Sequence, residues 1–290
     1  MPSRFFPKNH SSVLLHCKSA LYADDFKFIG DVSTPEDRRL MQADLDAVAR
    51  WSADNKLPIS FQKYFALYYG KNNTKQQYSV HGSVIKSTSS CADLGVLRCD
   101  DFSYDQHIHN VALKASRLSG MSLKLFSTRD QQFLTRVFTA FIRPIVEYAS
   151  CVWSPSSVSA STELEKVQQR FTKRINGMSN LQYEQRLDSL QLDTLAHRRH
   201  ISDLILAFKC LHGNVSVLPE SLGLQLSDAP TRSFGIRLKH FKPASKLLAS
   251  SFQCRVPIQW NNLPDRVLKC RSLSAFKVAL SKHFGEILAK

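Results

Sequence analysis

The chain has 290 residues, 43% hydrophobic and 22% charged, a composition typical of a globular protein rather than a disordered one. No apolar run reaches the roughly 18 residues of a transmembrane helix, and the first residues lack the apolar core of a signal peptide. We therefore expect no membrane partner and an intracellular location, in the nucleus or the cytoplasm. The seven cysteines are scattered without a CxxC pair, which argues against a disulfide scaffold.

The net charge of +15 is uneven, since residues 1–100 carry +3 and residues 229–290 carry +10. A field of that sign favours a polyanionic partner, nucleic acid before membrane. A basic surface that only aids solubility is the alternative.

Residues 17–30 alternate apolar and polar side chains and end at Gly30. This pattern predicts a strand–turn–strand hairpin with Asp24 and Asp25 at its bend. A helix follows, which Thr34 can cap and which has Pro35 at its first position. Its expected inner stripe consists of Met41, Leu45, Val48 and Trp51.

Short strand-like runs then occupy residues 58–70, 78–87 and 91–99, so we expect this part of the chain to be α+β. From Asp105 onward the pattern is helical. Thr128 is the expected cap of a helix that Pro144 kinks or restarts. The expected apolar face of that helix consists of Phe133, Val137, Phe138, Phe141, Ile145, Tyr148 and Val152.

Thr162 and Glu165 have the spacing of a capping box at the start of the next helix. Its buried face should hold Leu164, Val167, Phe171 and Ile175. The neighbouring flank carries four cations that can follow a phosphate backbone or can simply be solvated: Lys166, Arg170, Lys173 and Arg174. Further helices are expected from about Asp193 to Leu211 and from Ser272 onward.

Adjacent carboxylates repel each other, and a divalent cation removes the repulsion. Mg²⁺ prefers oxygen ligands and commonly binds one or two carboxylates together with substrate phosphates. Two such ions can activate a 3′-hydroxyl and stabilise the leaving pyrophosphate. Asp24 and Asp25 are therefore consistent with a nucleotidyl-transfer site, and a solvated turn is the alternative.

The surroundings of this pair resemble a known family. The stretch LYADDFKFIGD (21–31), the helix after it and LPISFQKYF (57–65) resemble the central part of a reverse transcriptase, an RNA-directed DNA polymerase. Tyr22-Ala23-Asp24-Asp25 matches the family's Tyr-x-Asp-Asp hairpin. The likeness is to jockey-like non-LTR retrotransposons (LINE elements). It continues through the family's helical thumb at 125–155 and its C-terminal region at 163–175, 192–213 and 251–267.

The resemblance implies a partial polymerase palm of antiparallel strands plus a helix at 1–100, a helical thumb and connection at 101–213, and a basic C-terminal region at 214–290. It implies an RNA template, a DNA primer and dNTPs as partners, and Mg²⁺ bound by Asp24 and Asp25. Tyr22 would lie beneath the primer end, and Leu94 with Gly95 would bind the primer.

Lys63 falls where the family has a lysine thought to protonate pyrophosphate, and a solvated strand lysine is the alternative. Two positions depart from the family's pattern. Ser60 replaces a usual asparagine, and Asp93 replaces a usual aromatic residue just before Leu94.

The family places a third catalytic aspartate on an earlier strand, whereas residues 1–23 contain no Asp or Glu. We therefore expect a chain that begins inside the polymerase, binds Mg²⁺ weakly or not at all, and does not polymerise as it stands. The alternative function is non-catalytic binding of nucleic acid. Two other clusters were considered as metal sites. His197 and His200 lie one helical turn apart, a possible metal-binding spacing, but no third ligand accompanies them, which favours a basic helix face. Cys91 and Cys99 with His107 and His109 lack a familiar ligand spacing.

Overall fold

The computed structural model describes residues 16–22, 25–56, 60, 63–227 and 237–288, and the chain forms two compact units, residues 1–102 and 103–290. The class is α+β, as the sequence predicts. The boundary between the units lies close to the expected palm–thumb boundary at residue 100. The expected segments 101–213 and 214–290 both belong to the second unit.

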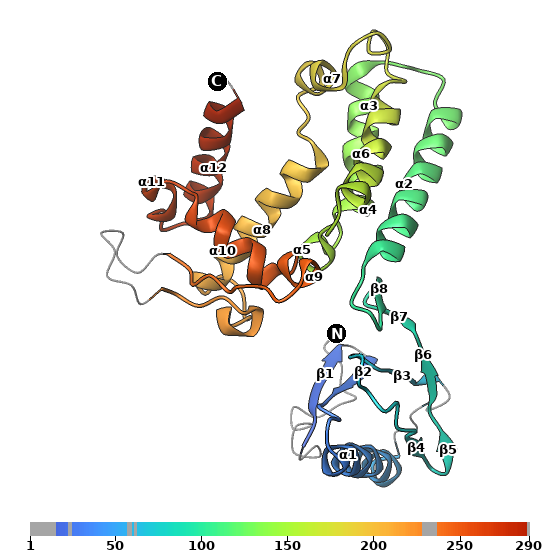
Figure 1. Cartoon of the computed structure of the whole chain (residues 1–290). Helices are drawn as coiled ribbons and strands as arrows, with labels where there is room; N and C mark the ends of the chain where they lie inside the picture. Colours follow the sequence, from blue (N-terminus) through green and yellow to red (C-terminus); the bar gives the residue numbers. More distant parts are fainter. Residues whose placement is uncertain (1–15, 23–24, 57–59, 61–62, 228–236, 289–290) are drawn as a thin grey trace. The chain divides into compact units, whose positions relative to one another are not determined.

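The first unit contains one long helix and short strands (Figure 1). Its elements are β1 (Lys18–Tyr22), β2 (Asp25–Ile29), α1 (Pro35–Asp54), β3 (Phe65–Leu67), β4 (Ser79–Val80), β5 (Ser83–Val84), β6 (Lys86–Thr88), β7 (Ser90–Asp93) and β8 (Val96–Cys99).

The described strands pair two by two. The pairs β1–β2, β4–β5 and β7–β8 are antiparallel hairpins, whereas β3 and β6 are parallel. The parallel pair departs from the antiparallel arrangement that the resemblance implies. The parallel direction follows from the connection between β3 and β6. Residues 68–85 contain the complete β4–β5 hairpin, so the chain enters β6 in the same direction in which it left β3.

Helix α1 begins as the sequence predicts. The Thr34 hydroxyl accepts a hydrogen bond from the Asp37 N–H (3.1 Å), and the Asp37 carboxylate accepts one from the Thr34 N–H (2.9 Å). Leu45 and Ala49 of α1 pack with Tyr78 and Val80 in a small apolar cluster. The buried carboxylate of Asp44 accepts hydrogen bonds from the N–H groups of His16 and Cys17, at 3.0 and 2.7 Å, and so ties α1 to the start of β1.

The second unit is helical (Figure 1). Its elements are α2 (Asp105–Leu125), α3 (Gln131–Val137), the π-helical turn η3 (Phe138–Ile142), α4 (Arg143–Glu147), α5 (Ser150–Trp153), α6 (Val158–Thr172), α7 (Tyr183–Leu190), α8 (Leu195–Leu211), the 3₁₀ turn η4 (Pro219–Leu222), α9 (Lys246–Ala249), α10 (Phe252–Asn261), α11 (Asp265–Leu268) and α12 (Leu273–Leu288).

Two groups of helices form this unit. Helix α2 packs along α6 and against the rod of α3, η3 and α4. Helix α8 packs against α6 and also against α10 and α12, where Phe208, Trp260 and Phe276 are completely buried. The buried Asp203 carboxylate receives a two-pronged ion pair from Arg255, at 2.7 and 2.9 Å, which joins α8 to α10. Each helix therefore contributes both apolar and polar contacts to the core.

The expected apolar face of 133–152 is wrong at several positions, and the π-turn accounts for the change at Phe141. Pro144 has no N–H, and in a helix its ring would clash with the carbonyl of residue 140. The Arg143 N–H instead bonds to the carbonyl of Phe138, five residues earlier. Phe138 and Ile142 are fully buried, whereas Phe141 and Tyr148 are 62% and 58% exposed. Phe133 and Val152, two further members of that face, are also exposed.

Two expected caps are also wrong. The side chain of Asp130, not Thr128, caps α3 by accepting from the Phe133 N–H at 2.8 Å. Helix α6 begins earlier than the sequence predicts, with Ser157 as its cap instead of Thr162. The expected buried face of α6 is confirmed, since Leu164, Val167 and Phe171 of the helix, and Ile175 beyond it, are all buried.

Candidate functional site

The β1–β2 hairpin carries the tyrosine and the aspartates that the sequence singles out. Tyr22 ends β1 and pairs with Asp25, which begins β2. Both are exposed, Tyr22 to 66%. Ala23 and Asp24, which connect the two strands, lie outside the described residues. The described part of the hairpin therefore presents one carboxylate, that of Asp25, beside its turn.

Leu94 and Gly95 form the two-residue turn between β7 and β8, because Asp93 pairs with Val96. Both have left-handed backbone angles, with φ of 47° and 80°, as a type I′ turn requires. Glycine adopts this conformation freely, whereas a leucine in it costs about 1 kcal/mol or more. Leu94 is also 46% exposed. A strained apolar side chain at an exposed tip is typical of a binding site.

An ion pair joins these two hairpins. The Lys27 ammonium of β2 lies 2.5 Å from Oδ2 of Asp93 in β7. The Arg98 guanidinium of β8 lies 3.0 Å from the same oxygen. The Asp93 side chain is only 15% exposed, so two cations neutralise a carboxylate that is largely withdrawn from water.

Sequence reasoning missed Lys27 and treated Asp93 only as a departure from the family's pattern. Because side chains alternate along β2, Lys27 lies on the same face as Asp25, two residues away. This alternation could have identified Lys27 as a residue near the site. Nothing local in the sequence indicates that Asp93, 66 residues further on, is its partner. Burial, followed by the nearby charge of Asp93, also raises the pKa of the Cys91 thiol.

Lys63 is exposed and lies two residues before β3. Its N–H donates to the carbonyl of Ser60 at 3.1 Å. No described contact joins Lys63 to the β1–β2 hairpin, since β3 pairs with β6 instead. The structure therefore does not bring Lys63 together with Tyr22 and Asp25.

The four predicted cations are all exposed, but only two of them lie on α6. Lys166 and Arg170 belong to the helix, whereas Lys173 caps its C-terminal end and Arg174 follows it, because α6 ends at Thr172. None of them forms an ion pair within the described part of the chain. The neighbouring carboxylate of Glu165 is turned toward α8 instead, where it accepts from the Leu195 N–H at 3.1 Å. This flank is a row of cations without compensating charge.

In the described ranges, no group of three or more His, Cys, Asp or Glu side chains could hold a metal ion. His197 and His200 of α8 both pack edge-on against Phe284 of α12. Burial, with His197 nearby, lowers the pKa of His200. These histidines therefore serve as packing groups between two helices.

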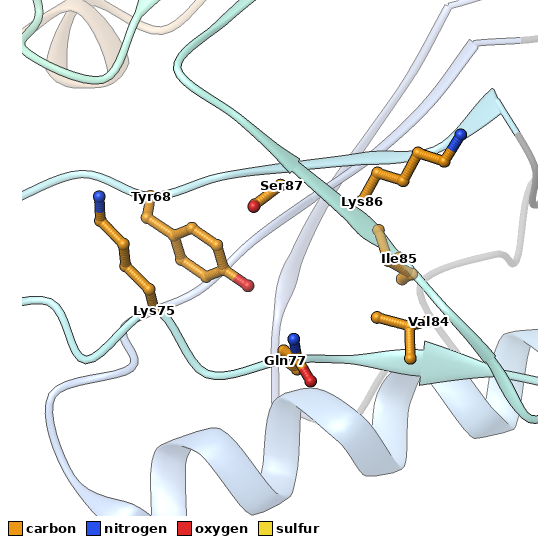
Figure 2. A pocket seen from close by; sticks show the side chains of 7 residues that line it. All are labelled: Tyr68, Lys75, Gln77, Val84, Ile85, Lys86 and Ser87. Carbon is orange, nitrogen blue, oxygen red and sulfur yellow. The ribbon is translucent and has the colours of Figure 1, made fainter.

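A shallow cavity of about 430 Å³ lies in the first unit (Figure 2). Its walls come from the segment after β3 and from β5 and β6: Tyr68, Lys75, Gln77, Val84, Ile85, Lys86 and Ser87. Figure 2 shows the two lysines on opposite sides, so their ammonium groups do not converge on one anion. None of the predicted site residues lines this cavity.

No family model, no curated protein and no solved structure matches this chain. Within the described residues, no helix combines the length and the apolar character needed to cross a membrane.

Proposed function

We propose that this chain is part of an RNA-directed DNA polymerase of a non-LTR retrotransposon, to which it contributes the Tyr-x-Asp-Asp hairpin, the thumb and the C-terminal region. The observation that supports the proposal best is the ion pair between Lys27 and Asp93. It holds the proposed catalytic hairpin against the proposed primer-binding hairpin, although 66 residues separate its two partners.

Template-directed synthesis requires that proximity. The 3′-hydroxyl of the primer must be held at the metal-binding carboxylates, because a displacement of about 1 Å already slows such reactions severely. A turn that binds the primer must therefore lie beside the aspartates. The turn of Leu94 and Gly95 directly follows Asp93, whose ion pair with Lys27 links the two hairpins and supports this proposal.

The proposed roles follow from these positions. Asp24 and Asp25 hold Mg²⁺, and the exposed Asp25 beside the turn is an oxygen ligand of the kind that Mg²⁺ prefers. When bound, the metal stabilises the charge on the phosphoryl group being transferred. Tyr22 supports the primer end across the hairpin from Asp25. Lys63 acts as proton donor only if nucleotide binding brings it to this hairpin.

A second candidate function is non-catalytic binding of nucleic acid, and the flank of α6 favours it. Lys166, Arg170, Lys173 and Arg174 are exposed without ion-pair partners among the described residues. Each cation that neutralises a phosphate steepens the dependence of log K on log salt by about one unit. The two candidates differ in where the primer end lies, not in whether nucleic acid binds.

A photocrosslink from the primer end separates them. The full chain is mixed with an RNA template and a DNA primer that ends in 4-thiothymidine, is irradiated with and without Mg²⁺, and is digested for mass spectrometry. The polymerase proposal predicts Mg²⁺-dependent crosslinks to residues 18–29, which Asp25→Asn weakens and Asp54→Asn, at the exposed end of α1, does not. Crosslinks confined to residues 163–175 would favour the second candidate.

Primer extension with dNTPs tests whether the chain polymerises alone. We expect binding without measurable extension, because the family's third catalytic aspartate lies on an earlier strand and residues 1–23 contain no Asp or Glu. Clear extension that Asp24→Ala abolishes would contradict this expectation.

A further inference from the structure

Two ion pairs share one carboxylate oxygen at the junction of the two hairpins. Lys27 Nζ and Arg98 Nε lie 2.5 and 3.0 Å from Asp93 Oδ2. The side chains of Lys27 and Arg98 are 42% and 40% exposed, although the Arg98 Nε atom that meets the carboxylate is buried. Two cations therefore neutralise the Oδ2 side of Asp93.

The two pairs do different things. Arg98 pairs with Cys91 in the β7–β8 register, so Arg98 and Asp93 are diagonal neighbours within one hairpin. This pair stiffens the β7–β8 hairpin itself. Lys27 belongs to β2, so its pair with Asp93 is the contact that links the two hairpins.

Both partners of the linking pair lie next to a turn. Lys27 is two residues from Asp25 and on the same face of β2. Asp93 is the last residue before the turn of Leu94 and Gly95. The ion pair therefore links the two hairpins close in sequence to both turns.

We infer that Lys27 and Asp93 are positioning residues, whose ion pair holds the strained Leu94–Gly95 turn near Tyr22 and Asp25 so that both hairpins contact the same primer end. The inference rests on the proposed function and deepens it, because it assigns a role to two residues outside the Tyr-x-Asp-Asp motif. A purely structural ion pair would affect stability without changing which tip touches the primer.

The test measures the ratio of two crosslinks from the 4-thiothymidine primer end, those to residues 90–99 over those to residues 18–29. In the unmodified chain both segments are labelled. Lys27→Gln removes the linking pair and leaves the pair of Asp93 with Arg98, so the ratio should fall about tenfold. Lys27→Arg keeps the positive charge and should preserve the ratio within about a factor of two.

Lys18→Gln is the matched control, because Lys18 is an exposed lysine of the same hairpin at the end away from the tip. It should leave the ratio unchanged, and circular dichroism melts of all three variants establish that they fold. An equal ratio in Lys27→Gln and the unmodified chain would overturn the inference and leave the proposed function standing. No crosslink to either hairpin in the unmodified chain would overturn the proposed function, and the inference with it.

Discussion

In the second unit, tryptophan and phenylalanine side chains are completely buried between helices, whereas the first unit has a small apolar cluster and polar contacts that tie its hairpins to the rest. All the largest fully buried side chains of the described residues lie in the second unit, among them Trp153, Trp260 and Phe276. In the first unit, Asp44 ties α1 to β1 and Lys27 ties β2 to β7. Apolar burial grows with contact area, while isolated polar contacts add about 1 kcal/mol each. We therefore expect the first unit to open more readily than the second.

The largest effect should come from deleting a core tryptophan. Trp260→Ala removes a fully buried ring that packs against Phe276 and should lower the free energy of unfolding by about 4 kcal/mol. Trp51→Ala, at a half-buried tryptophan of α1, should cost about half as much. Urea denaturation followed by circular dichroism measures both. Equal losses of unfolding free energy in the two variants would contradict the expected difference in packing between the two units.

The next largest effect concerns the polar contact that anchors β1. Asp44→Ala removes the acceptor of two backbone N–H groups and should destabilise the first unit by about 2 kcal/mol. Amide hydrogen exchange in residues 18–29 should accelerate, while exchange in α8 and α10 should not change. Asp54→Ala, at an exposed aspartate of the same helix, serves as the control. Unchanged exchange in the β1–β2 hairpin would show that Asp44 does not anchor it.

One partly buried thiol in each unit, Cys17 and Cys151, allows the local stability of the two units to be compared. Burial, reinforced by Asp44, raises the pKa of Cys17 from 9.0 to about 12. Burial, reinforced by Asp203, does the same to Cys151. At pH 8 both native thiols should react with N-ethylmaleimide about a thousandfold more slowly than in the denatured chain, because the thiolate is the nucleophile. Cys17 should still be labelled before Cys151, through local opening of the first unit.

The same shifts make stability depend on pH. A thiol with a raised native pKa stays protonated while the unfolded thiol ionises near 9.0. The stabilisation is therefore complete below pH 9 and is lost as the pH rises toward 12.

In the labelling experiment with N-ethylmaleimide, modification of Cys151 before Cys17 would contradict the expected order of local stability.

The smallest effect on stability should come from the flank of α6. Arg170→Ala alters an exposed cation without an ion-pair partner among the described residues, so the free energy of unfolding should change by less than about 0.5 kcal/mol. The salt dependence of primer–template binding should decrease by about one unit in the same variant. A large loss of stability would assign Arg170 to the fold instead of to a binding surface.

Local patterns predicted a good part of the fold. The cap of α1 at Thr34 and the buried face of α6 follow from contacts within three or four residues. The end of α8 at Leu211, before Gly213 with its φ of 66°, has the same origin. Prediction failed where one residue changes the helical period. The π-turn before Pro144 shifts the register and exposes Phe141, which a constant period of 3.6 residues places inside.

The candidate site likewise combines features that the sequence predicts with features that only the tertiary structure shows. The amino-acid sequence by itself determined the hairpin at 17–30 and the exposure of the cations at 166–174, because short-range hydrogen bonding and side-chain alternation decide these features. At 91–99 it predicted only a strand-like run, which the structure shows to be a second hairpin that turns at Leu94 and Gly95. Only the tertiary structure decided that the hairpins meet through Lys27 and Asp93 and that β3, the strand that follows Lys63, pairs with β6. A contact across 66 residues depends on how the whole unit closes, and no local pattern of the chain encodes that distance.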